Sequence, residues 1–98
     1  MTPEGKVKAK VKKALVELGV SLYRFMPVQT GYGADALDFY LCVGGWFVAI
    51  ETKAGNKPLT ARQEALAETI CAAGGLVFVI RDDKTLKRSM HQIKKLLR

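Results

Sequence analysis

The sequence has few cysteines, a single histidine and no long apolar run, and each scarcity excludes a class of protein. Two cysteines without a Cys-x-x-Cys pair, together with one histidine, provide no ligand set for zinc. The longest uncharged apolar run, residues 39–50, is much shorter than the roughly 20 residues of a membrane helix. The N-terminus has no apolar segment of a signal peptide. We therefore expect a cytoplasmic protein with no membrane partner, in which Cys42 and Cys71 are reduced core residues.

Negative charge is also scarce in this chain. Sixteen Lys and Arg against nine Asp and Glu give a net charge of +7. The basic residues gather in segments 6–13 and 81–98, whereas most of the acids lie between them. Such a distribution predicts a polyanionic partner, nucleic acid above all. The other interpretation is that these segments are basic helices with a solvated outer face.

Length and composition predict one domain that spans residues 1–98. A chain of 98 residues is too short for two independent cores. Its hydrophobic fraction of 49% and charged fraction of 26% are those of an ordinary globular protein.

Periodicity and capping residues predict the order α-β-β-β-α-β-α. Thr2, Thr60 and Asp82 or Asp83 are placed to cap helices. The wholly apolar run 76–80 predicts a strand buried on both faces and, after a helical crossover, parallel to the strand before that helix. We expect an α/β fold with a mixed four-stranded sheet flanked by helices. The expected helices are 3–18, 61–73 and 83–97, and the expected strands are 21–28, 37–43, 46–52 and 76–80.

A β-hairpin is predicted around the Gly-Gly pair at 44–45. If these two residues form the turn, the register places Asp38 directly opposite Glu51. Like charges in such a position are destabilising. Because side chains alternate along a strand, Lys53 projects from the same face as Glu51.

The opposed carboxylates have two interpretations. Lys53 alone can neutralise them, which gives a structural cluster at the end of a hairpin. Alternatively, the carboxylates and a backbone carbonyl are hard oxygen ligands suited to Mg²⁺ or Mn²⁺, and Lys53 holds or polarises an attacking water. With a basic exterior, the second interpretation indicates phosphodiester hydrolysis.

The segment 31–36 matches the glycine pattern of dinucleotide-binding proteins as a string of letters. That pattern has a mechanical meaning only between a strand and a helix, and a β-rich segment follows it here. We therefore expect no nucleotide cofactor. The glycines are better suited to let a loop approach a sugar-phosphate strand.

Asp38 followed by Glu51-Thr52-Lys53 resembles the core of the PD-(D/E)XK nuclease superfamily. The closer similarity is to its virus-type replication-repair nuclease (VRR-NUC) branch, in the small stand-alone form found in phages and bacteria. The resemblance implies a restriction-endonuclease-like α-β-β-β-α-β core with an additional C-terminal helix. It covers most of the chain, in the blocks 2–4, 31–33, 37–39, 47–53, 60–63 and 72–75.

The resemblance also implies an activity, namely a Mg²⁺- or Mn²⁺-dependent DNA endonuclease of repair or recombination. Its members act as homodimers on branched DNA such as four-way (Holliday) junctions, here in a bacterial or phage-infected cell. The implied metal ligands are Asp38, Glu51 and the Thr52 carbonyl, with Lys53 positioning the water, Glu4 reaching the metal directly or through water, and Gln63 beside metal and substrate. Beside the resemblance, we expect DNA contacts from Gly31, Tyr32 and Gly33 in the loop and from Lys6, Lys10 and Lys13 on the first helix. Lys57 is a further candidate for a phosphate contact, or else a plain loop lysine.

Several of these assignments have structural alternatives. Glu4 favours the helix dipole of a first turn, and Gln63 fits a capping box with Thr60. Ala36-Leu37 stands where the family often has proline or glycine before the aspartate. At the level of function, the alternatives are a non-catalytic basic DNA-binding module and a nuclease subunit that needs a partner protein.

Overall fold

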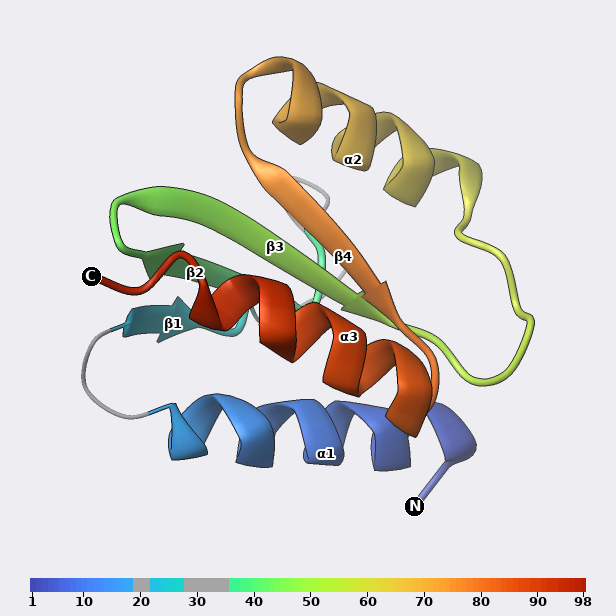
Figure 1. Ribbon diagram of the computed structural model, residues 1–98. Coiled ribbons are helices and arrows are strands. Elements are labelled where there is room, and N and C mark those ends of the chain that lie inside the picture. Colours follow the sequence, from blue (N-terminus) through green and yellow to red (C-terminus); the bar gives the residue numbers. More distant parts are fainter. Residues whose placement is uncertain (19–21, 28–35) are drawn as a thin grey trace.

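A computed structural model describes residues 1–18, 22–27 and 36–98 of the chain (Figure 1). The predicted order of elements is confirmed. None of the helices in these ranges has the length and apolarity needed to cross a bilayer. The elements are α1 (Pro3–Glu17), β1 (Leu22–Phe25), β2 (Phe39–Val43), β3 (Trp46–Thr52), α2 (Ala61–Ala72), β4 (Leu76–Ile80) and α3 (Asp83–Lys94).

The four strands form one mixed sheet in the order β1-β2-β3-β4. The first three strands pair antiparallel, and β4 pairs parallel to β3 after the α2 crossover, as predicted. The hairpin register is also confirmed, since Val43 lies opposite Trp46 and Tyr40 opposite Ala49. The register therefore brings the start of β2 next to the end of β3.

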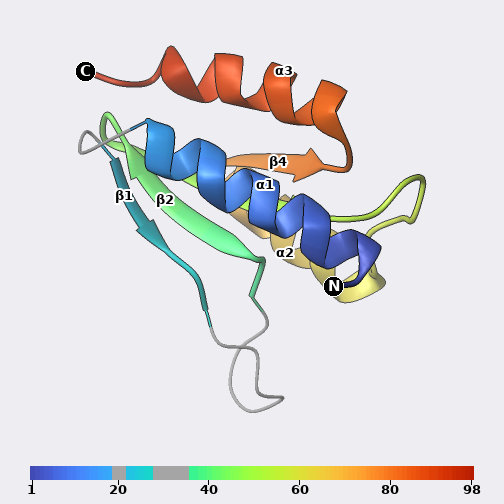
Figure 2. The same cartoon turned by 90° about the horizontal axis from the view of Figure 1, so that it is seen from below.

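The core lies between one face of the sheet and the helices α1 and α3. Val11 and Leu15 of α1 and Met90 and Ile93 of α3 are buried there. Helix α2 lies on the opposite face, over β4, so that β4 is between α2 and α3 (Figure 2). The buried sheet residues of this core are Phe39, Leu41, Val43, Val48, Ile50 and Ile80.

Two predictions about the side of the sheet that faces α2 are wrong. Strand β4 is not buried on both faces, because only Ile80 is fully buried and its other residues are half-buried. Cys42 and Cys71 are exposed free thiols and not core residues. The reason is the same for both: α2, whose residues are all described, buries none of its side chains and leaves much of this face open.

The predicted caps position the beginnings of the helices. The Thr2 hydroxyl accepts a hydrogen bond from the Gly5 N–H at 2.9 Å. Thr60 forms the predicted capping box with Gln63, and Asp82, one of the two predicted candidates, caps α3. Because caps fix where a helix begins, they also place Glu4 and Gln63 in first turns.

The turn residue Gly44 provides a stability prediction. A Cβ added there would lie 1.8 Å from the Leu96 carbonyl oxygen, in a backbone with φ +57°. Gly55 has the same φ, but no atom lies within 4 Å of its added Cβ. We expect Gly55→Ala to lower the free energy of unfolding by about 1 kcal/mol, because of the left-handed backbone alone. Gly44→Ala should lower it by at least about 2 kcal/mol more, because its Cβ also clashes with Leu96. Urea denaturation of both variants measures the difference, and equal costs would contradict the packing of Leu96 on the turn.

Candidate metal and nuclease site

Five segments of the chain meet where β3 ends. The first two turns of α1, Pro27 after β1, the residue before β2, the end of β3 and the first turn of α2 line an open cavity of about 490 Å³. Antiparallel pairing of β2 with β3 brings Asp38 next to the end of β3. The helix caps place the first turns of α1 and α2 beside them. The lining includes every residue predicted for catalysis or metal binding: Glu4, Asp38, Glu51, Thr52, Lys53 and Gln63.

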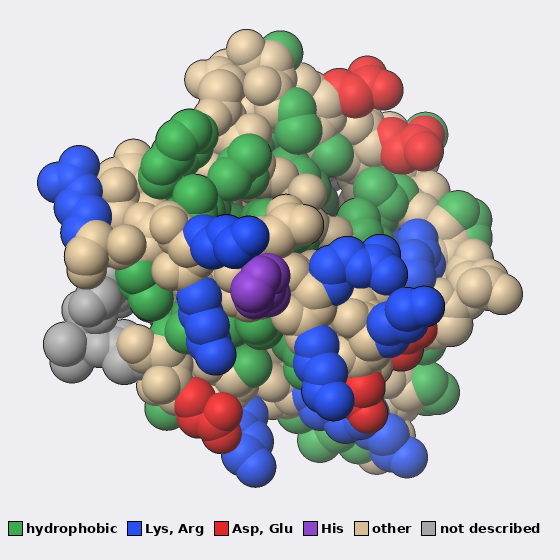
Figure 3. Space-filling view, in the orientation of Figure 1, with side chains coloured by type: hydrophobic (Ala, Val, Ile, Leu, Met, Phe, Trp, Pro, Cys, Tyr) green, Lys and Arg blue, Asp and Glu red, His purple; other side chains and the backbone are tan. Residues whose placement is uncertain are grey.

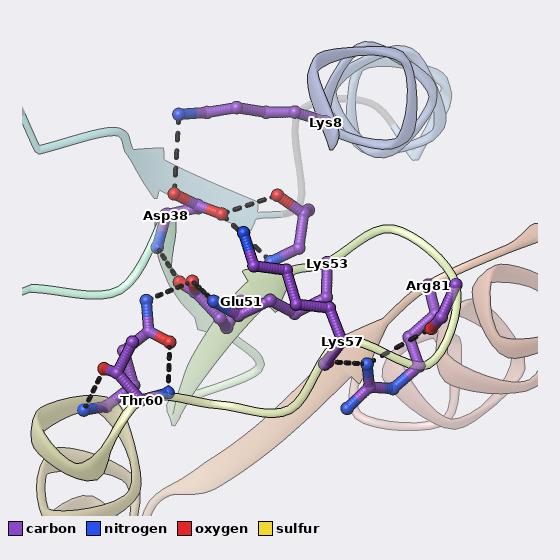
Figure 4. A network of polar contacts seen from close by, with 10 residues as sticks. Lys8, Asp38, Glu51, Lys53, Lys57, Thr60 and Arg81 are labelled. Atoms are coloured by element: carbon purple, nitrogen blue, oxygen red, sulfur yellow. Dashed lines mark hydrogen bonds and ion pairs between the residues drawn. The ribbon is translucent and has the colours of Figure 1, made fainter. Parts of the chain in front are cut away.

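Asp38 is anchored by the end of β3 (Figure 4). Its Oδ2 accepts hydrogen bonds from the Thr52 N–H at 2.9 Å and from the Thr52 hydroxyl at 2.6 Å. Its own N–H donates to Glu51 Oε1 at 3.1 Å. The two acids are therefore adjacent, as the register predicted, and backbone donors hold each carboxylate in place.

Glu51 is a buried carboxyl group, with a side chain only 3% exposed. Burial raises its pKa to about 7, and the charges of Asp38 and Glu4 act in the same direction. The Lys53 ammonium, 3.9 Å from Glu51 Oε2, and the Asp38 N–H oppose the rise in pKa. A carboxyl group in this environment favours its charged form once a further cation is close.

Gln63 forms the predicted capping box and also contacts Glu51. Its Oε1 accepts the Thr60 N–H at 3.0 Å and its backbone N–H donates to the Thr60 hydroxyl at 3.2 Å, which completes the capping box. At the same time its Nε2 donates to Glu51 Oε2 at 2.7 Å. The cap therefore orients the amide group that contacts the acid.

The Thr52 carbonyl is directed to the site by the hydrogen-bonding pattern of β3. The Lys53 N–H donates to the Ile80 carbonyl of β4, so the backbone polar groups of Lys53 face β4. The neighbouring Thr52 points its N–H to the other edge, where it binds Asp38. In a strand, the N–H and C=O of one residue face the same edge. This strand geometry places the carbonyl of Thr52 on the Asp38 side of β3.

These groups fit a hard divalent cation. Asp38 and Glu51 supply carboxylate oxygens and Thr52 a carbonyl oxygen, which are the donors that Mg²⁺ and Mn²⁺ prefer. Within residues 1–18, 22–27 and 36–98, no three His, Cys, Asp or Glu side chains form a metal-binding group by themselves. Glu4 lines the cavity without joining the two acids in such a group, so a cation held here would need the Thr52 carbonyl and water to complete its coordination.

Lys8 is a site residue that the sequence interpretation missed. Its Nζ lies 3.4 Å from Asp38 Oδ1, and its side chain is part of the cavity wall. A signal for it was present, because Lys8 follows Glu4 by four positions and so shares its face of the helix. The lysines predicted as DNA contacts are its neighbours on other faces of α1.

None of the described lysines predicted as DNA contacts lines the cavity. Lys57 is exposed on the loop after β3, and Arg81 donates hydrogen bonds to the carbonyls of Lys57 and Gly55, which ties that loop to the end of β4. Lys10 is paired with Asp83 at 2.9 Å and joins α1 to α3. Lys6 and Lys13 are exposed on α1. The predicted contacts Gly31, Tyr32 and Gly33 lie outside the described residues.

Comparison of the chain with models of protein families, with curated proteins and with solved structures finds no match. The resemblance to the VRR-NUC branch therefore rests on the sequence motifs alone.

Proposed function

We propose that the protein is a metal-dependent endonuclease that hydrolyses DNA phosphodiester bonds. The observation that carries this proposal is the convergence of Asp38, Glu51 and Lys53 with the Thr52 carbonyl around one open cavity. Two adjacent carboxylates with a buried lysine are costly to assemble, because each charge has to be removed from water. A site that binds a cation and acts on an anion accounts for that cost.

Each residue has a role in the proposed reaction. Asp38, Glu51 and the Thr52 carbonyl hold Mg²⁺ or Mn²⁺, which supplies positive charge next to the phosphate. Lys53, whose side chain is 5% exposed, holds the attacking water by a hydrogen bond from its ammonium group. Gln63 keeps Glu51 in its orientation through the 2.7 Å hydrogen bond. Glu4 contributes a further charge at the cavity wall.

The surface charge supports a nucleic-acid substrate. Lys and Arg side chains gather around the histidine on the face that α3 presents in Figure 3. The inner side of α3 is apolar and packs on the sheet, whereas most of its exposed side chains are basic. A surface of this kind binds the phosphate backbone without reading sequence. The exposed basic residues of this segment are Lys84, Lys87, Arg88, Lys94, Lys95 and Arg98.

Cutting of a synthetic four-way DNA junction tests the proposal. The purified protein is incubated with the junction in Mg²⁺, in Mn²⁺ and in EDTA, next to a linear duplex of the same length. We expect cutting in either metal and none in EDTA. A preference for the junction supports branched DNA as the substrate, and absence of cutting in both metals contradicts the proposed activity.

We also propose that the protein acts as a homodimer, and the open face of the sheet supports this. Tyr23, Cys42 and Phe47 lie opposite one another in β1, β2 and β3, and all are exposed. Phe25 is exposed one cross-strand pair further along the same face. Contiguous exposed aromatic surface is typical of an interface. A second copy that packs its own face here would bury the aromatic residues of both subunits at once.

Tyr23→Lys is expected to convert the dimer to a monomer, because it places two charges at the interface of a two-fold dimer. Tyr23 is 68% exposed, so the substitution leaves the core untouched. Val16→Lys on α1, at a residue 58% exposed, is the matched control on the other side of the molecule. Sedimentation velocity of the three proteins measures the result. A monomeric wild-type protein, or a dimer that survives Tyr23→Lys, contradicts this interface.

A second candidate is a non-catalytic DNA-binding module. The observation in its favour is that both carboxylates already have partners: Lys8 and Thr52 bind Asp38, and Lys53 and Gln63 bind Glu51. Calorimetric titration with Mn²⁺ separates the candidates. Salt-sensitive DNA binding without metal binding favours the module, and metal binding without cutting favours a nuclease subunit that needs a partner protein.

A further inference from the structure

Lys8 reaches the site from α1, opposite the side on which Lys53 lies (Figure 4). Its side chain is 41% exposed, while that of Asp38 is 13% exposed. The ion pair is long, at 3.4 Å, and no other hydrogen bond or ion pair of the Lys8 ammonium is present among the described residues. Lys8 is therefore a cation at the mouth of the cavity that can change its position without disturbing the core.

The two oxygens of Asp38 are not equivalent. Oδ2 accepts two hydrogen bonds from Thr52, which occupy both of its lone pairs. Oδ1 accepts only the Lys8 ammonium. A divalent cation bound by Asp38 has to use Oδ1, and there it repels Lys8. The metal ion and the lysine thus compete for the same carboxylate oxygen.

The formal charge of the cavity wall indicates which group the displaced Lys8 can bind. Without metal, the acids Glu4, Asp38 and Glu51 outnumber the cations Lys8 and Lys53. A divalent cation reverses this balance, so that the cavity then attracts anions. A lysine displaced at its mouth is in position to pair with a phosphate.

We propose that Lys8 occupies the metal-binding oxygen of Asp38 in the free protein and binds a backbone phosphate of the nucleic acid once metal has displaced it. Lys8 is thereby a positioning residue that couples metal binding to substrate binding. This inference rests on the proposed function, because it assumes that the same cavity binds metal and a phosphodiester.

Titration with Mn²⁺ in the absence of DNA tests the first half of the inference. Lys8→Met keeps the apolar stem and removes the competing charge, and it is expected to tighten Mn²⁺ binding roughly three- to fivefold, the size of one partly exposed ion pair. Lys12→Met, one turn further along α1, is the matched control for the loss of net charge. Lys8→Arg keeps the competing charge and is expected to bind Mn²⁺ like the wild-type protein. Unchanged or weaker binding to the Lys8→Met variant overturns the inference.

DNA binding tests the second half, in a Lys53→Met background that prevents cutting. Adding Lys8→Met is expected to weaken binding of a four-way junction about fivefold in Mn²⁺ and to lower the salt dependence by about one counterion. In EDTA the same change is expected to alter binding less than twofold, because Lys8 is then held by Asp38. An equal loss of DNA affinity with and without metal overturns the inference that Lys8 binds phosphate only after metal displaces it. If the wild-type protein binds no metal at all, the proposed function itself is wrong.

Discussion

Lys53→Met is expected to lower the single-turnover rate of DNA cutting by a factor of about 10²–10⁴, while metal and DNA binding persist. Lys53 is buried 3.9 Å from Glu51 and extends from the same strand face, so its ammonium can hold a water beside the proposed metal ligands. Methionine fills the same space without a donor. Rapid-quench measurement with excess enzyme isolates the chemical step from product release.

Removal of either carboxylate has a different signature. We expect Asp38→Ala and Glu51→Ala to lose both Mn²⁺ binding and cutting, and the double variant to be no worse than either single one, because the two ligands act as a unit. Glu68→Ala, on the exposed side of α2, is the matched control for the loss of an acid. Unchanged cutting by Asp38→Ala, Glu51→Ala or Lys53→Met would show that the activity lies elsewhere.

Metal binding is expected to depend steeply on pH. Burial raises the pKa of Glu51 to about 7, so that below this pH a proton competes with the metal for the carboxylate. The apparent affinity for Mg²⁺ should therefore fall up to about tenfold per pH unit below 7 and level off above it. Calorimetry between pH 5.5 and 8 measures the profile. A flat profile over this range would contradict ionised Glu51 as a ligand.

The stability of the metal-free protein is expected to show the opposite trend. Glu51 has a pKa of about 7 in the folded protein and its ordinary value of 4.5 when unfolded. Between these values the folded state binds more protons, so the free energy of unfolding falls as pH rises through the range, by at most about 3 kcal/mol. Urea denaturation from pH 4.5 to 8 measures this fall.

Two comparisons assign the fall in stability to Glu51. A Glu51→Gln variant has no group that titrates at this position and should lack the decrease, because an amide is neutral throughout the range. Saturating Mg²⁺ should reduce the decrease in the wild-type protein, because the cation stabilises the charged carboxylate. The same decrease in the variant would assign it to other groups.

Much of the fold follows from short stretches of the chain. Thr2, Thr60 and Asp82 begin their helices because a capping side chain acts on a backbone N–H only a few residues away. The two glycines at 44–45 set the hairpin turn, and the turn sets the register. These local rules were enough to place Asp38 beside Glu51 and Lys53 on the face of Glu51.

Other features depended on contacts between distant segments. Lys8 meets Asp38 only because α1 crosses the end of the sheet, and Gln63 reaches Glu51 only because α2 begins there. The open face was missed for the same reason. The apolar run of β4 and the cysteines predicted burial, but how much a helix covers depends on where it docks.

The chain's own order of residues thus decided the caps, the hairpin and the pair of opposed acids, because each depends on atoms close together along the backbone. The packing of α1 and α2 against the sheet decided which lysine pairs with Asp38, which amide contacts Glu51 and which sheet face stays open. Those outcomes depend on how distant segments fill space together, and no short-range pattern encodes that.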